Sequence, residues 1–204
     1  LRLSGGDEVI VAVEGFNRDT GRIVLRIEGR EEVCDDGIDE DGDGAFDCED
    51  LDCFLTCEDP SDWPMAWVSF EEGVLAETNR YRAEGYTCGP YQGAPAETFP
   101  PVHPLEMNRF LTFSSRLHAR DMGINNYFEH NSQDGRTPGD RMRMVGFDGD
   151  GPTGENIAAG QPGPAEVVEG WMTSPGHCRN IMDPDYHILG VGYAYLEGSD
   201  FGHY

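Results

Sequence analysis

The sequence lacks lysine and has few basic residues of any kind. All 14 basic residues are arginine, they face 39 acidic residues, and the formal net charge is -25. Such a charge leaves no basic surface for a nucleic-acid backbone or an anionic membrane. Long apolar runs are missing as well, since no segment approaches the roughly 20 apolar residues of a membrane-spanning helix. These absences argue against nucleic-acid binding and against a transmembrane segment.

The beginning of the sequence carries neither a signal peptide nor an initiator methionine. It opens at Leu1 inside a segment that alternates like a strand, so we expect a fragment of a longer secreted protein. A length of 204 residues with 38% apolar content supports one main domain with small appendages.

Six cysteines, an even number, indicate disulfide bonds and an extracellular or cell-surface location. They form one tight group and one distant pair: Cys34, Cys48, Cys53 and Cys57, then Cys88 and Cys178. We predict two local bridges within the group, whose pairing stays open, and a long-range bridge between Cys88 and Cys178. Four cysteines around zinc are the alternative for the group, but its usual CxxC spacing is missing.

Composition divides the chain into distinct parts. Residues 1–30 contain two alternating apolar runs around a turn and predict the last strands of a truncated β-sandwich. Residues 31–60 are rich in aspartate and cysteine and have almost no core residues. Residues 60–66 contain two prolines and predict a linker. Residues 67–204 have the mixed pattern of a globular main domain.

The aspartates of the second part fit a twelve-residue calcium loop. Alternating carboxylates offer the oxygens that a hard cation binds, and Gly44 permits the sharp turn. The predicted ligands are Asp39, Asp41, Asp43, Ala45, Asp47 and Asp50. The last of these replaces the glutamate of an EF-hand, and the cysteine-rich flanks leave no room for two helices. We therefore predict a small disulfide-rich calcium module, with a solvated acidic linker as the alternative.

The main domain is predicted to contain three helices followed by strands. Apolar residues recur at helical spacing over 70–84 and 104–122, with Pro104 in the first turn of the second helix, and a short helix covers 165–172. The tail from Ile181 alternates like strands. Helices and strands that do not alternate strictly indicate an α+β fold, arranged as an α-β-α sandwich.

Several sequence blocks resemble, in order, the signature blocks of the CAP superfamily, also called the SCP or sperm-coating-protein-like superfamily. The blocks are LAETNRYRAEG, PLEMNRFLTFSSRLHARDM, FEHNSQDG, GENIAAG, WMTSPGHCRNIM and LGVGYAY. The resemblance covers about Trp67 to Tyr204 and is nearest to the bacterial secreted branch. Members usually continue into one more strand, so it implies that the domain lacks its last strand after Tyr204. The acidic island resembles calcium-dependent spacer repeats in secreted proteins of myxobacteria.

The CAP resemblance implies a central cleft in which two histidines and two acidic residues hold a divalent cation, often zinc. The matching positions here are His130, Glu155 and His177. Imidazole nitrogen and carboxylate oxygen are both suitable zinc donors. The second acid has no match, because none closely follows Trp171, and Glu169 falls on a different side of its helix.

Each of these side chains also has a purely structural interpretation. His177 could cap the preceding helix, His130 could bond to backbone, and Glu155 could accept N–H bonds at a turn. His118 lies on the apolar stripe of the second predicted helix and is expected to be a core histidine. We expect Trp171 in the core or beside a ligand groove.

Three functions are compatible with these features. The first is a secreted binding module whose cleft takes a small hydrophobic ligand, a peptide or a glycan. The second is a zinc-dependent hydrolase in which His130 and His177 hold the metal and Glu155 activates water; a Ser174–His177 pair is a weaker variant without a visible orienting acid. The third is a structural or adhesive segment of a surface protein. The binding module is favoured, and no catalytic residue is assigned.

Overall fold

The computed structural model describes residues 63–147, 149 and 151–204. The modules predicted for residues 1–30 and 31–60, with the calcium loop and the four clustered cysteines, lie outside the described residues. The helices are α2 (Met65–Glu84), α3 (Arg109–Asn125), α4 (Pro138–Met144), α5 (Pro164–Thr173) and α6 (Pro175–Met182). The strands are β1 (Tyr86–Cys88), β2 (Glu97–Phe99), β3 (Glu106–Met107) and β4 (Ile188–Leu189).

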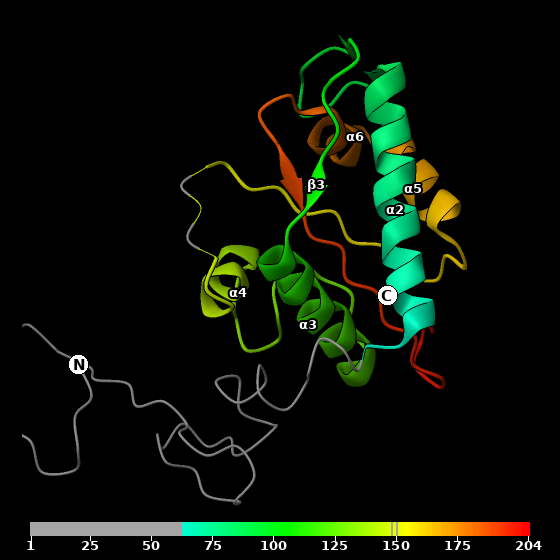
Figure 1. Ribbon diagram of the computed structural model, residues 1–204, viewed down its shortest axis with the longest axis vertical. Helices are drawn as coiled ribbons and strands as arrows, with labels where there is room; N and C mark the ends of the chain where they lie inside the picture. The colour runs from blue at the N-terminus through cyan, green and yellow to red at the C-terminus, as the bar shows by residue number, and fades with distance from the viewer. Residues whose placement is uncertain (1–62, 148, 150) are drawn as a thin grey trace, which may run out of the picture.

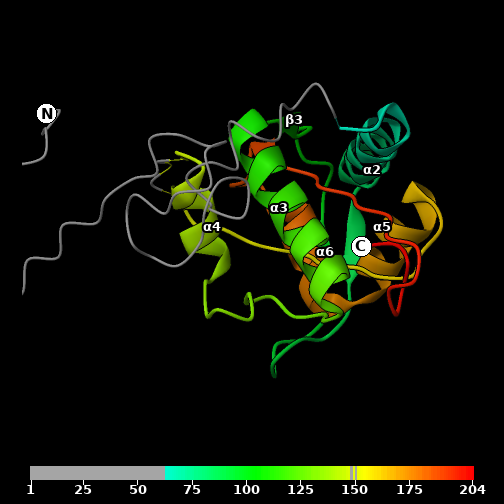
Figure 2. The same cartoon turned by 90° about the horizontal axis from the view of Figure 1, so that it is seen from below.

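The described chain is a mixed α and β fold, as expected. Helices α2, α5 and α6 contact one another on one side of the short β3–β4 pair, and α3 contacts α4 on the other side (Figure 1). Figure 2 shows α3 between α4 and the α2–α5 pair. β3 and β4 run parallel, whereas β1 and β2 form a separate antiparallel pair. Within the described ranges, no helix combines the length and apolar character needed to cross a membrane.

The predicted linker is wrong in its second half. Trp63 is 7% exposed and packs edge-on against Trp67, with ring centroids 5.1 Å apart. Helix α2 begins at Met65. The indole of Trp63 gains burial against the first turns of α2, which outweighs the tendency of the two nearby prolines to interrupt regular structure.

The second predicted helix begins later than expected. Pro104 is not its first turn, because Asn108 caps α3 by accepting hydrogen bonds from the backbone N–H groups of Phe110 and Leu111 at 3.0 and 3.1 Å. Asparagine is a strong N-cap residue and satisfies donors that the first turn leaves free. The chain just before Asn108 is extended instead and forms β3.

The tail is less regular than the predicted strands. Ile181 and the residues before it belong to α6, which begins at Pro175 directly after α5 and was not predicted. A regular strand is limited to Ile188–Leu189, after which Ala194 and Tyr204 exchange backbone hydrogen bonds of 3.1 and 2.9 Å. Proline at the first helical position favours α6 over continued strand. The further strand expected after Tyr204 lies beyond this sequence and stays a prediction.

Two long-range connections fix the helices around the site. The guanidinium of Arg82, with 0% exposure, donates to the carbonyl oxygens of His103, Ile181, Asp183 and Tyr186. The predicted Cys88–Cys178 disulfide is present and joins β1 to α6 across 90 residues. Arg82 anchors α6 to α2, the disulfide anchors α6 to β1, and α6 carries His177.

Candidate functional site

The predicted cleft residues His130 and Glu155 meet in space. Nδ1 of His130 lies 2.8 Å from Oε1 of Glu155, although 25 residues separate them in sequence. Because a carboxylate only accepts hydrogen bonds, Nδ1 carries the proton and Nε2 of a neutral ring is the free acceptor. The side chain of His130 is 51% exposed, so this nitrogen is accessible. The pair is an imidazole oriented by a carboxylate.

Glu155 also forms an ion pair with a buried arginine, Arg141, that sequence analysis did not identify. Nη2 of Arg141, on α4, donates to Oε2 of Glu155 at 2.5 Å, and the Arg141 side chain is 2% exposed. A capping box between Thr137 and Asp140 begins α4 and so sets the position of Arg141 one residue later. Each carboxylate oxygen of Glu155 therefore accepts a hydrogen bond from another side chain.

His177 is placed beside this pair by helix α6. Its backbone carbonyl oxygen accepts a hydrogen bond from Nδ2 of Asn156 at 3.2 Å, and Asn180 donates to Oδ1 of Asn156 at 2.9 Å. These bonds tie the Gly-Glu-Asn segment to α6. Partial burial, and next the neighbouring His130, lower the pKa of His177. His177 is a residue inside α6 rather than a cap of α5.

The three predicted zinc donors do not fit a zinc shell in this arrangement. Zinc sites in proteins use at least three protein ligands. Both oxygens of Glu155 already accept hydrogen bonds, from His130 and Arg141, so a metal ion at this carboxylate would have to share or displace these bonds. Across the part of the chain that the structure describes, no group of three or more His, Cys, Asp or Glu residues is arranged to hold a metal ion. The calcium ligands predicted at 39–50 lie outside that part.

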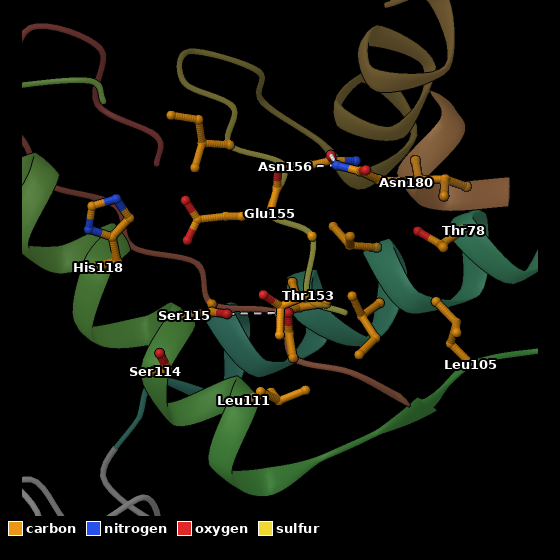
Figure 3. Close-up of a pocket in the computed structure, with 18 of the residues that line it drawn as sticks. Thr78, Leu105, Leu111, Ser114, Ser115, His118, Thr153, Glu155, Asn156 and Asn180 are labelled. Carbon is orange, nitrogen blue, oxygen red and sulfur yellow. Dashed lines mark hydrogen bonds between the residues drawn. The ribbon is translucent and has the colours of Figure 1, made fainter. Parts of the chain in front are cut away.

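A cavity of about 460 Å³ lies directly behind Glu155. It is bounded by α2, α3, α5, the 151–158 segment and the chain from Ile188 to Tyr193. Figure 3 shows His118 and Glu155 at one end of the cavity and Thr78 with Leu105 at the other. Neither His130 nor His177 lines it.

Two glycines explain how the chain forms one wall of this cavity. A Cβ atom at Gly190 would overlap the backbone of Leu111, and one at Gly192 would overlap the backbone of Arg116. Only glycine allows this tail segment to lie so close to α3. The lining also includes Trp171, which was expected in the core or beside a groove and donates from Nε1 to the carbonyl oxygen of Ile157 at 3.0 Å.

Four polar side-chain atoms of residues that line the cavity are buried and have no hydrogen-bond partner among the described residues. They are Oγ1 of Thr78, Nδ1 of His118, Oε1 of Gln161 and the hydroxyl of Tyr204. Buried polar groups are normally bonded, and an unbonded one costs about 1–3 kcal/mol. The four residues that carry these atoms all line the same cavity.

His118 is buried as predicted, with 3% exposure, but it is bonded on one side only. Its Nε2 lies 2.9 Å from the carbonyl oxygen of Glu129, which can only accept, so Nε2 carries the proton. Burial, and next the charge of Arg141, lower the pKa of His118. The ring is therefore neutral near pH 7, and its Nδ1 is a buried acceptor without a partner among the described residues.

The fold and the site define a class: a disulfide-stapled mixed α and β domain with a polar histidine–glutamate pair above an apolar cavity. Residues 75–204 match the CAP family, described as the cysteine-rich secretory protein family. The chain belongs to this family. The match supports the resemblance seen in the sequence blocks.

Relatives in Bacillus agree with this assignment. The chain is 43% identical over 131 residues to the uncharacterized protein YkwD of Bacillus subtilis, covering 64% of this chain and 45% of YkwD. It is 40% identical over 75 residues to the uncharacterized membrane protein YlbC of the same organism, covering 37% of this chain and 21% of YlbC. The chain thus spans less than half the length of both relatives.

A solved structure shows a similar fold. The crystal structure of an extracellular protein containing an SCP domain from Bacillus anthracis superposes with a TM-score of 0.50 at 25% identity. The likeness covers 69% of this chain and 42% of that protein.

Proposed function

We propose that this CAP domain is an extracellular binding module whose cavity takes a small neutral lipid with a hydroxyl group. The observation that carries the proposal is the set of unpartnered polar atoms around the cavity behind Glu155. The extracellular location is supported by the even set of cysteines, the Cys88–Cys178 bridge and the described extracellular relative. The calcium module predicted at 31–60 is proposed as a spacer beside this domain.

The size and lining of the cavity favour an apolar body. A volume of about 460 Å³ lies within the range of about 300–1,000 Å³ typical of ligand pockets. Carbon atoms dominate its surface, contributed by side chains such as Val74, Leu111, Met122 and Val191. Burial of a hydrocarbon against them is favourable by about 25 cal/mol per Å².

The polar atoms favour a neutral donor over an anion. Nδ1 of His118 and Oε1 of Gln161 are buried acceptors without a partner among the described residues, so a ligand that reached them after a side-chain shift would have to supply an O–H or N–H. The hydroxyls of Thr78 and Tyr204 serve as either donor or acceptor. A carboxylate offers no hydrogen to these acceptors and meets the carboxylate of Glu155 at the same wall. A fatty alcohol therefore fits better than a fatty acid.

The test compares two ligands of equal chain length, dodecanol and dodecanoate. Binding is measured by displacement of a fluorescent apolar probe and by the shift in melting temperature. We expect dodecanol to bind at least tenfold more tightly than dodecanoate. Mass spectrometry of lipids extracted from the purified protein gives an independent measure.

A matched pair of variants locates the site. Ala119 lines the cavity and is 4% exposed, so Ala119→Phe should fill the hollow and abolish dodecanol binding. Ala83 is exposed on α2, so Ala83→Phe should leave binding unchanged. Stronger binding of dodecanoate, or binding of a short peptide or a glycan in its place, would refute the proposed ligand class. Equal binding by Ala119→Phe and Ala83→Phe would refute the proposed location.

A further inference from the structure

We infer that Arg141 takes the place of a divalent cation in this cleft. Its guanidinium neutralises Glu155 and, through Glu155, holds His130 in position, so the cleft is assembled without a metal ion. Arg141 is then a positioning residue. The inference does not depend on which ligand occupies the cavity.

The first support is how completely Arg141 is enclosed. Besides Glu155, its Nη1 donates to the carbonyl oxygen of His130 at 2.9 Å, and lies 3.4 Å from both Oγ of Ser132 and the carbonyl oxygen of Arg136. One guanidinium therefore fixes the backbone that carries His130 and the carboxylate that orients the His130 ring. A bound metal ion would hold separate segments together in the same way.

The second support is charge. An arginine side chain stays protonated in proteins, so Arg141 supplies a permanent positive charge within 2.5 Å of Glu155. A divalent cation at Glu155 would meet this charge at close range in a partly buried site, where like charges repel strongly. It would also have to displace a charge-assisted hydrogen bond, which is among the strongest in proteins.

The third support is the shortage of other donors. The position that would supply a second acid after Trp171 holds none, and Glu169 is exposed on α5. Across the described residues, no additional carboxylate or thiolate completes a group of three with His130 and His177. Two imidazoles alone fall short of the three protein ligands that zinc sites use.

The test measures zinc affinity by competition with a chromogenic chelator at pH 7.5. The wild-type protein is compared with the double variant His130→Gln/His177→Gln. We expect equal zinc affinities, because neither histidine holds zinc while Arg141 is present. A wild-type affinity tenfold or more above that of the double variant would overturn the inference.

A second experiment removes the hydrogen bond between Arg141 and Glu155. Arg141→Met leaves the Glu155 carboxylate free to join the two histidines, so zinc affinity should rise at least tenfold and the melting temperature should increase with zinc. Adding Glu155→Gln should remove this gain. Arg143→Met is the control, because Arg143 lies on the same helix with its side chain 70% exposed, and it should leave zinc affinity unchanged.

The two arms decide the inference separately. A folded Arg141→Met protein without any gain in zinc affinity would overturn it. Should Arg141→Met fail to fold, even with zinc, the comparison of wild type with His130→Gln/His177→Gln alone decides.

Discussion

A buried ion pair between α2 and α3 gives a sharp test of how this domain is held together. Oε1 and Oε2 of Glu71 accept from Nε and Nη2 of Arg116 at 2.9 and 2.6 Å. The Glu71 side chain is 2% exposed and that of Arg116 is 11% exposed. The backbone N–H of Tyr193 also donates to Oε1 of Glu71 at 3.2 Å. The pair thus joins both helices to the tail that forms one wall of the cavity.

The perturbation is Arg116→Met, which keeps an apolar stem of similar length and removes the charge. Glu71 is then left buried without its cationic partner. Removing one partner of a buried ion pair costs about 3–5 kcal/mol, because the remaining charge is desolvated and uncompensated. A domain of this size has about 5–15 kcal/mol of stability, so the loss is a large fraction of the total.

The cost should depend on pH with a definite sign. Burial raises the pKa of Glu71 above its ordinary value, and Arg116 opposes this rise. Without Arg116 the folded-state pKa rises further, so the variant binds a proton in the folded state over a wider pH range. The protonated form of Glu71 contributes stability that is present below the unfolded-state pKa. This stability is lost as the pH rises through the folded-state pKa of Glu71. The destabilisation by Arg116→Met should therefore be smaller near pH 4 than near pH 7.

Urea unfolding followed by circular dichroism at both pH values measures this cost. Arg80→Met is the control, because Arg80 pairs with Glu77 at 2.8 Å on the exposed face of α2 and should show no measurable change. An Arg116→Met protein as stable as the Arg80→Met protein would refute the reasoning. A destabilisation of the same size at pH 4 and pH 7 would refute the part that concerns Glu71.

Three other parts of the chain give further tests. Alanine at both Cys88 and Cys178 opens a loop of 90 residues and should reduce the free energy of unfolding by about 4.6 kcal/mol in the chain-entropy model, measured by urea titration; no loss would contradict it. Asn108→Ala removes the cap of α3 and should cost about 1 kcal/mol in the same assay, and an unchanged midpoint would show that the cap is dispensable. Millimolar calcium should raise the melting temperature if residues 39–50 bind it, and Asp43→Asn should weaken that shift.

Local signals predicted the helices that depend on local chemistry. The short helix expected over 165–172 corresponds to α5, because proline and the apolar spacing act within a few residues. The predicted helix start at Pro104 was wrong, because Asn108 caps the helix with its side chain and proline has no side-chain acceptor to do so. Helix α6 escaped prediction because Ser-Pro-Gly is as typical of a helix end as of a helix start.

The site was predictable only where a residue belongs to a recognisable motif. His130 and Glu155 stand in such motifs, and the structure brings them to within 2.8 Å of each other. Arg141 carries no signal of its own, because its burial depends on carbonyl groups of the His130 segment, which fold against it from elsewhere in the chain. The capping box that precedes Arg141 predicts a short helix but does not predict which side of it is buried.

The cavity lay beyond sequence reasoning because backbone contacts between distant segments create it. No pattern within the tail reveals that Gly190 and Gly192 lie against α3, yet this contact sets the width of the hollow. Glu155 then belongs to both parts of the site, since it orients His130 on one side and faces the cavity on the other. Under the proposed function, a ligand that reached Glu155 from the cavity would share this carboxylate with Arg141 and His130. The exposed imidazole and the cavity thus meet at one carboxylate, whose orientation Arg141 sets.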